Sequence, residues 1–451
     1  MKGKMIKKIT ALAMAAMLAL GTLAGCGGNS GTQGGNDTTG KTTQAAGETK
    51  GQDSTAAGDA SQGSASDEGQ GTAGDASQSG DEGQGATANG GTIMWLSNIS
   101  SGIAYDVAVN YANMICDELG YKFQVVYGDS FNDPAGNLNA VKNGMTSDVV
   151  GLIMSQDGGI KDIMAEYPDL YVAGYNTDML SVFAEDGDNK DVAANAKFLG
   201  TICDGHYDGT LIGKDYAQAV IEKGYKKVAT VMFPAYAYPM LPVADAAFRE
   251  EIAKYNETAA DADKIEIVGE AKVLEFAPLD ESFFLEEGNG DLDAIAAFCA
   301  GTDFVYPTMK SAMANGSCAA DTKLITGGFN NDASIVADIG GDGVIQYIAI
   351  SPAEDLAWPL IMLDNALNGK PYSDFTAAER IDPTTYVIDT KEKIDNVMAK
   401  SMAGTADVTK AQLTMDDLKN VMTRFNPDAT YADLVALFQS DKLTTDALAD
   451  K

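Results

Sequence analysis

The stretch DYAQAVIEKGYKKVATVMF, residues 215–233, joins a helix to a strand through a single glycine. We expect the helix to begin with an N-cap at Asp208 and to end at Gly224, because glycine readily takes the left-handed conformation that closes a helix. The residues that follow predict a β-strand. A helix that leads at once into a strand is the repeating step of an α/β sheet.

The same alternation begins at Gly91 and runs through the first part of the chain. Strands are expected at 92–98, 122–128, 148–154 and 169–175, with helices between them. These strands are continuous apolar runs, which is typical of parallel strands buried on both faces. The sequence therefore predicts a parallel sheet with helices on both sides.

A second set of strands follows an irregular acidic stretch at 179–197. Its strands are expected at 198–204, 227–233, 265–273, 292–301, 323–332 and 343–351. The simplest account is an α/β fold with two doubly wound parallel-sheet lobes, joined by crossings near Cys203 and Ser351. In open α/β sheets, ligands sit at the carboxyl ends of the strands, so each loop after a strand is a candidate wall of a cleft.

These crossings divide the folded part of the chain into two lobes and a tail. We assign 91–203 and 352–375 to an N-terminal lobe and 204–351 to a C-terminal lobe. Apolar residues at helical spacing predict a helical C-terminal extension over 376–451. We expect its helices to pack on a lobe, although a docking surface for a permease or sensor is an alternative.

The N-terminus has the layout of an export signal. A lysine-rich start precedes an apolar segment that is too short to span a bilayer, and Leu23-Ala24-Gly25-Cys26 resembles the bacterial lipobox. The resemblance implies a signal peptide at 1–25 and a lipid on Cys26. Residues 26–90 are rich in Gly, Ser and Asp with no large apolar residue, so we expect a disordered tether. The expected location is the extracytoplasmic face of a bacterial membrane.

Charge restricts the classes of partner. The formal net charge is −34, of which about −31 lies in residues 91–451. Nucleic acid is therefore not expected as a partner, because there is no basic stripe to neutralise phosphates. The only arginines are Arg249, Arg380 and Arg424, so an anionic ligand is also disfavoured.

Cysteine and histidine usage argues against several kinds of chemistry. No CxxC pair occurs, and Cys299 with Cys318 is the only disulfide worth testing. His206 is the single histidine, so neither a histidine metal site nor a Ser-His-Asp hydrolase is expected. We predict no enzyme, no metal and no cofactor. An exported hydrolase that uses Asp157 and Asp303 is the weaker alternative.

An exported chain of two βα lobes resembles the type I periplasmic binding proteins, the ribose- and galactose-binding family that serves ABC importers. The resemblance covers 92 to about 375 and is carried by 215–233, by LITGGFNND and by IAISPAEDLAWPLIMLDNALNGK. Where the family's sugar binders have Asp-Arg after the fourth strand, this chain has Asn176-Thr177. Ala244 stands where they have an arginine, and Thr302-Asp303 where they have Asn-Asp. The resemblance implies the fold more firmly than the ligand.

The candidate ligand-binding residues are polar or aromatic side chains expected after strands: Asn98, Ser100, Asp157 and Asn176 in the first lobe, and Tyr207, Tyr236, Tyr238, Thr302, Asp303, Asn330 and Asp332 in the second. Hydroxyls, amides and carboxylates suit a neutral polyol, and tyrosines can stack on a sugar. The alternative is that the polar residues cap helices and form turns, while the tyrosines fill the core of their own lobe.

Together these features predict a solute-binding lipoprotein that captures a small neutral polar molecule, with a sugar favoured, and passes it to an ABC permease. The expected partners are that ligand, the permease and the membrane through the N-terminal lipid. A receptor of the same fold that signals to a membrane kinase is an alternative, and a nucleoside or a small cation is an alternative ligand.

Overall fold

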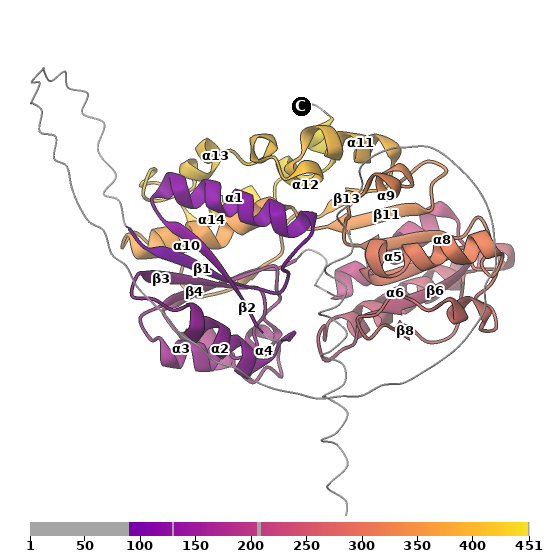
Figure 1. The fold of residues 1–451 in the computed structure, drawn as a ribbon, viewed down its shortest axis with the longest axis horizontal. Helices are drawn as coiled ribbons and strands as arrows, with labels where there is room; N and C mark the ends of the chain where they lie inside the picture. Colours follow the sequence, from indigo (N-terminus) through magenta and orange to yellow (C-terminus); the bar gives the residue numbers. More distant parts are fainter. Residues whose placement is uncertain (1–89, 129, 205–208, 450) are drawn as a thin grey trace, which may run out of the picture. The chain divides into compact units, whose positions relative to one another are not determined.

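Two separate sheets organise the chain (Figure 1). The computed structural model describes residues 90–128, 130–204, 209–449 and 451. Cys26, with the expected signal peptide and tether, lies outside the described residues, as do His206, Tyr207 and the expected cap Asp208.

The first sheet has six parallel strands in the order β12-β5-β4-β3-β1-β2. The strands are β1 (Thr92–Ser97), β2 (Lys122–Tyr127), β3 (Val149–Met154), β4 (Tyr171–Tyr175), β5 (Phe198–Ile202) and β12 (Arg380–Ile381). Every residue of the inner strand β1 is buried, whereas the edge strand β2 is half-exposed. The continuous apolar runs in the sequence are therefore strands covered on both faces, as predicted.

Helices cover both faces of this sheet (Figure 1). They are α1 (Ile103–Leu119), α2 (Pro134–Gly144), α3 (Ile160–Glu166), the short α4 (Leu180–Phe183) and α10 (Ala357–Leu367), with a 3-10 turn, η1, at Lys190–Ala194. α1 and α10 enclose one apolar cluster and α2 and α3 another. Local signals set their ends: the Asp133 side chain caps α2, and α1 stops at Gly120, whose φ is 82°.

The second sheet runs β13-β11-β10-β9-β6-β7, with β8 also paired to β6. Its strands are β6 (Lys227–Met232), β7 (Glu266–Ile267), β8 (Lys272–Val273), β9 (Ala294–Ala300), β10 (Lys323–Gly327), β11 (Ile345–Ile350) and β13 (Tyr386–Ile388). All pairs are parallel except β11 with β13. The single strand expected at 265–273 is two short strands instead, because the chain turns at Gly269, where φ is 64°.

The helices of the second lobe include α5 and α6, which pack together through small residues. They are α5 (Gly209–Lys223), α6 (Leu241–Thr258), α7 (Gly301–Phe304), α8 (Tyr306–Asn315) and α9 (Ala333–Ala337), with 3-10 turns η2 (Asp261–Asp263) and η3 (Glu281–Leu285). A Cβ at Gly213 would lie 2.3 Å from the carbonyl oxygen of Ala244. Ala244 is itself fully buried in this contact, so it acts as a packing residue of the second-lobe core.

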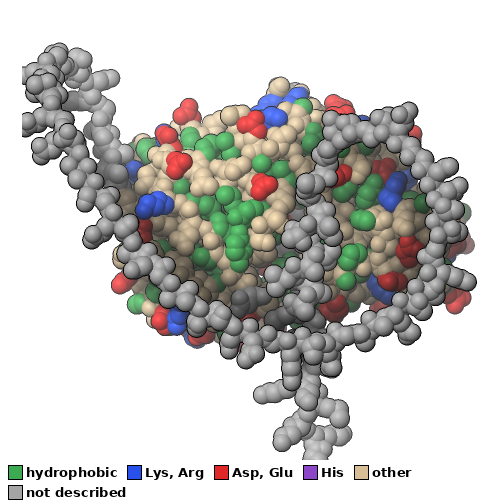
Figure 2. All heavy atoms as spheres, in the orientation of Figure 1, with side chains coloured by type: hydrophobic (Ala, Val, Ile, Leu, Met, Phe, Trp, Pro, Cys, Tyr) green, Lys and Arg blue, Asp and Glu red, His purple; other side chains and the backbone are tan. Residues whose placement is uncertain are grey.

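On the face shown in Figure 2, acidic and basic side chains are scattered among apolar and uncharged ones. The most exposed large apolar side chains are Leu285 and Tyr236. Among the described helices, none has both the length and the apolar character that a membrane crossing needs.

The C-terminal extension is not helical throughout, which corrects the prediction for 376–451. It supplies β12 to the first sheet and β13 to the second, so the chain crosses between the lobes a third time, between residues 381 and 386. The remainder contains α11 (Lys391–Lys400), α12 (Met402–Thr405), α13 (Met415–Asn420) and α14 (Tyr431–Phe438), and the 3-10 turns η5 (Val408–Lys410), η6 (Asp441–Leu443) and η7 (Asp446–Leu448). Strands of two or three residues are too short to produce a periodic sequence signal.

The extension packs on both lobes. Ile394 and Val397 of α11 belong to the apolar core of the second lobe, while Leu434 and Phe438 of α14 belong to that of the first. Near the end of the chain, Leu448 returns to the second core. The extension is therefore part of the folded unit and contributes to both hydrophobic cores.

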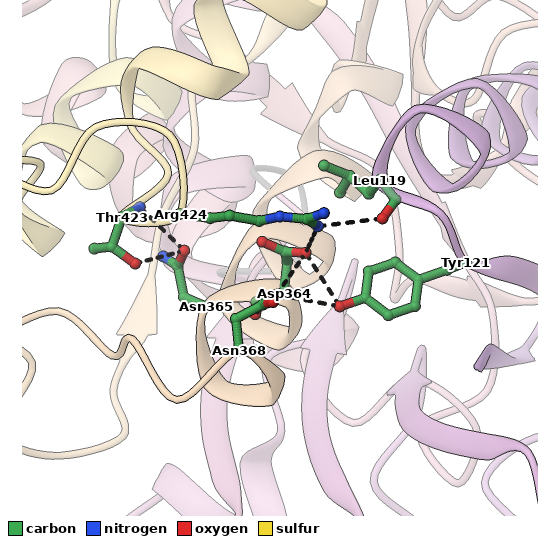
Figure 3. Close-up of polar contacts among 7 residues, drawn as sticks. All are labelled: Leu119, Tyr121, Asp364, Asn365, Asn368, Thr423 and Arg424. Atoms are coloured by element: carbon green, nitrogen blue, oxygen red, sulfur yellow. Dashed lines mark hydrogen bonds and ion pairs between the residues drawn. The ribbon is translucent and has the colours of Figure 1, made fainter. Parts of the chain in front are cut away.

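A buried ion pair fastens the extension to the first lobe (Figure 3). Arg424 donates to Asp364 of α10 at 2.9 Å and to the carbonyl of Leu119 at 3.2 Å. Asp364 is fully buried and also accepts hydrogen bonds from Tyr121 and Asn368. Burial raises the pKa of Asp364, while the charge of Arg424 acts to lower it.

The extension also reaches the segment that links β11 to α10. Gln412 is buried and donates its backbone N–H to the Glu354 carboxylate at 2.8 Å, and its side chain accepts from Tyr386 of β13. Its amide group donates to the carbonyls of Lys442 and Thr444. The Gln412 side chain thus joins β13 to the last turns of the chain, and its backbone N–H adds the crossing segment.

The described cysteines, Cys116, Cys203, Cys299 and Cys318, are free thiols. The Cys299–Cys318 disulfide, the one pairing that the sequence left to test, is therefore not formed. Burial raises the pKa of Cys116 to about 12, which keeps that thiol protonated and unreactive at neutral pH.

Candidate functional site

A cavity lies between the loops that follow the strands of the two lobes. Its lining residues are Asn98, Phe131, Asn132, Gln156, Asp157, Thr177, Asp178, Met179 and Leu180 from the first lobe, and Ala237, Tyr238, Pro239 and Met240 from the second. The first-lobe residues follow β1, β2, β3 and β4, and the second-lobe residues follow β6. This is the position at which open α/β sheets bind ligands.

Hydrogen bonds between neighbouring loops hold the first-lobe wall in place. The backbone N–H of Asn132 donates to the Gln156 side chain, and the Asn132 side chain accepts from Gly158 N–H at 2.7 Å. The Asp157 carboxylate accepts from the backbone N–H of Ser181 at 2.7 Å. The loops after β2, β3 and β4 therefore brace one another.

The electrostatic character of this wall is acidic. Asp157 and Asp178 both line the cavity and are almost completely buried. Among the described lining residues there is no lysine, arginine or histidine. Ionised carboxylates only accept hydrogen bonds, so the wall suits a ligand that donates them through hydroxyl or amino groups.

The second-lobe wall is mainly apolar. Tyr238 presents a ring that stacks on Phe233 at 5.6 Å, and Ala237, Pro239 and Met240 flank it. One wall thus offers hydrogen-bonding groups and the opposite wall offers apolar surface, an arrangement that matches a molecule with a polar edge and an apolar face.

The cavity is small, with a volume of ≈ 50 Å³. Pockets that hold small organic ligands usually measure about 300–1,000 Å³. The lobes are in direct contact around the cavity, so they must move apart to admit a molecule the size of a sugar.

Three of the candidate residues are brought together by the structure: Asn98, Asp157 and Tyr238 all line the cavity. Ser100 is exposed and does not line it. Asn176 sits at the end of β4 with a left-handed φ of 57°, and its buried Oδ1 has no hydrogen-bond partner. Tyr236 is 67% exposed and donates to Glu275 at 3.0 Å, outside the lining.

The other second-lobe candidates form their own cluster after β9 and β10. Asn330 donates to Asp303 at 2.6 Å and accepts from the backbone N–H of Asp332 at 2.8 Å. Asp332 caps α9 by accepting from Ser334, and these bonds lower the pKa of its carboxyl group. Thr302 is fully buried, and its hydroxyl has no partner. These residues lie at strand ends but do not line the cavity.

Sequence reasoning did not find Phe131, although its ring forms part of the cavity wall. The available signal was an aromatic residue in the turn-forming segment GDSFNDP after the second strand, where polar residues dominate. Phe276, which stacks on Phe131, was also not anticipated, because it follows one of the short strands that the sequence did not separate.

Buried carboxylates gather where the chain crosses between the lobes. Ser351 donates to Asp204, and Asp355 is 1% exposed with neither carboxylate oxygen hydrogen-bonded. Burial, with the nearby charges of Glu354 and Asp204, raises the pKa of Asp355 well above its usual range. Among the described residues, no group of acidic, cysteine or histidine side chains has the arrangement of a metal site.

Comparison with known proteins identifies the fold. No protein-family model matches the chain, and no curated protein matches its sequence. Solved structures do match: a periplasmic ribose ABC transporter protein from Conexibacter woesei has 16% identity and a TM-score of 0.50, with coverage of 70% of this chain and 97% of that one. A Mycobacterium smegmatis protein in complex with β-D-fucofuranose has 14% identity, a TM-score of 0.50 and the same coverages.

The chain therefore has the type I periplasmic-binding-protein fold. This confirms the α/β fold class with two lobes that the alternation of strands and helices predicted. The candidate ligand-binding residues remain predictions, because identities of 14% and 16% relate these chains by fold alone.

Proposed function

We propose that this protein is a solute-binding lipoprotein that takes a sugar or related polyol between its two lobes and delivers it to an ABC importer. The observation that carries the proposal is the interlobe cavity, lined by polar side chains after four first-lobe strands and by an apolar second-lobe loop. The two solved structures of the same fold support it, since one is described as a ribose ABC transporter protein and the other holds a furanose sugar.

Each wall has a distinct role in this proposal. The carboxylates of Asp157 and Asp178 accept hydrogen bonds from ligand hydroxyls, and the Asn98 amide can both donate and accept. The Tyr238 ring packs on the apolar face of the ligand. No bond in the ligand is made or broken, and the energy of binding draws the lobes together around it.

A thermal-shift screen of the full chain tests the ligand class. A ligand that binds only the folded state raises Tm, by an amount that grows with its concentration. We expect a sugar or cyclitol from a panel of pentoses, hexoses and inositol to raise Tm. A panel in which only amino acids, nucleosides or polyamines raise Tm would contradict the proposed ligand class.

A substitution in the cavity then tests the location. Asn98→Ala removes an amide from the first-lobe wall. It should weaken binding by about 1–3 kcal/mol, which corresponds to a roughly 5- to 150-fold rise in Kd. The matched control is Asn113→Ala, on the exposed surface of α1, where affinity should not change. Equal affinity in both variants would place the ligand elsewhere.

The anchor and the importer need experiments in cells. Cys26→Ala should release the protein from the membrane fraction, because it removes the residue that would carry the lipid anchor. Deleting the gene should abolish uptake of the sugar found in the screen. Normal uptake combined with loss of a sugar-dependent transcriptional response would instead support a receptor that signals to a kinase.

A further inference from the structure

The ring of Phe131 crosses from the first lobe to the second. Phe131 lies in the loop between β2 and α2, yet it stacks on Phe276 of the second lobe with centroids 5.0 Å apart and planes 5° apart. It also contacts the Tyr238 ring at 5.5 Å. Both partners belong to the other lobe, so these contacts exist only while the lobes are together.

The second lobe presents an aromatic cluster that receives this ring. Phe233 contacts Tyr238 at 5.6 Å, Phe276 at 5.1 Å and Phe304 at 5.0 Å. Phe233 is buried, and the other three rings are half-buried. Phe131 thus completes a cluster of five rings in which four come from one lobe and one from the other.

The loop that carries Phe131 is braced on its own lobe. Its neighbour Asn132 is bonded to Gln156 and Gly158, and Asp133 caps α2, which begins with Pro134. Because the segment directly after Phe131 is anchored, a displacement of the ring strains these first-lobe hydrogen bonds. The ring is therefore connected to the loop after β3 and to the start of α2.

The backbone of the receiving residue is in an unfavourable conformation. Phe276 has a φ of 55°, in the left-handed region that a bulky side chain rarely adopts. Such a conformation persists only where surrounding contacts favour it. Here it directs the ring between Phe233 and Phe131.

We propose that Phe131 is an interlobe latch, which holds the two lobes together through its stack on Phe276 and its contact with Tyr238. The latch lies at one edge of the sheets, since β2 is an edge strand of the first sheet and β8 pairs at the edge of the second. It stabilises the closed arrangement of the lobes through the protein's own side chains, without a bound solute. The proposal therefore does not depend on the identity of the ligand.

Removing the ring should shift the balance between closed and open lobes by about tenfold or more, because two aromatic contacts and a partly buried ring are lost. The shift can be followed by double electron–electron resonance, which measures the distance between two spin labels, on the full chain without added sugar. Spin labels carried by non-natural amino acids at the exposed positions Asp169 and Glu270, one on each lobe, spare the native cysteines.

In the labelled protein without a further substitution, we expect a single short distance between the two spin labels. In the labelled Phe131→Ala variant, we expect a longer and broader distribution of this distance. Phe131→Tyr keeps the stack and should restore the short distance. Phe425→Ala, which removes a ring outside this cluster, should leave it unchanged.

Phe276→Ala, in the second lobe, is an independent test in case Phe131→Ala fails to fold. It removes the partner ring and should lengthen the distance between the spin labels in the same way. An unchanged short distance in a folded Phe131→Ala or Phe276→Ala variant overturns the latch. That result would leave the proposed sugar binding intact, since affinity is measured separately.

Discussion

Removing Arg424 tests whether the C-terminal extension is an integral part of the fold. Arg424→Ala leaves the buried Asp364 carboxylate with hydrogen bonds from Tyr121 and Asn368 but without its positive partner. Leaving one member of a buried ion pair uncompensated typically costs about 3–5 kcal/mol. With roughly 2 °C of Tm for each kcal/mol in a chain of this size, we expect Tm to fall by about 6–10 °C.

The effect of Arg424→Ala on Tm should depend on pH, because the pKa of Asp364 differs between the folded and unfolded states. The folded-state pKa of Asp364 is raised by burial, so ionising this group opposes folding, and its stability cost grows as pH rises above the unfolded value near 4. Without Arg424 the folded-state pKa rises further. The difference in Tm between Arg424→Ala and the unchanged chain should therefore be large at pH 7 and shrink towards pH 4.

Thermal unfolding followed by circular dichroism, with a double-mutant cycle, measures this coupling. Adding Asp364→Asn to Arg424→Ala removes the unpaired charge and should recover much of the lost Tm at pH 7. An Arg424→Ala variant that melts within 2 °C of the unchanged chain, or a second substitution that gives no recovery, would show that the ion pair is not what fastens the extension.

Two other sites give independent predictions. Asp355→Asn should raise Tm at pH 7–8 by a few degrees and have little effect near pH 4. The reason is that the folded-state pKa of Asp355 is raised, so its ionised carboxylate destabilises the fold only as pH rises. A lower Tm at pH 7 in Asp355→Asn would mean that the fold needs this charge. Thr430→Ala removes the capping box of α14 and should cost about 1 kcal/mol in urea unfolding, whereas an unchanged midpoint would show that packing alone fixes that helix.

The sequence predicts the parts of the fold that depend on local pattern. Residues 215–233 form the expected helix, glycine stop and strand, because Gly224 can adopt the φ of 73° that ends α5. The inner strands are likewise evident as apolar runs. Such features depend on residues close together in the chain, which is the information that periodicity contains.

The parts that depend on distant partners could not be predicted. β12 and β13 are short and gain their strand conformation from pairing with β5 and β11, so the third crossing has no local signal. The same holds for Phe131, whose contacts with Phe276 and Tyr238 join positions more than a hundred residues apart. Polar strand ends could be identified as a class, but which of them line the cavity depends on how the lobes meet.

The central claim is that the ligand binds between the two lobes, and hydrogen–deuterium exchange of the full chain tests it most directly. With the sugar found in the thermal screen, we predict slower exchange in the first-lobe loops at 155–158 and 176–180 and, in the same sample, in the second-lobe loop at 234–240. Protection confined to one lobe, or protection of neither set of loops by a sugar that raises Tm, would contradict the account.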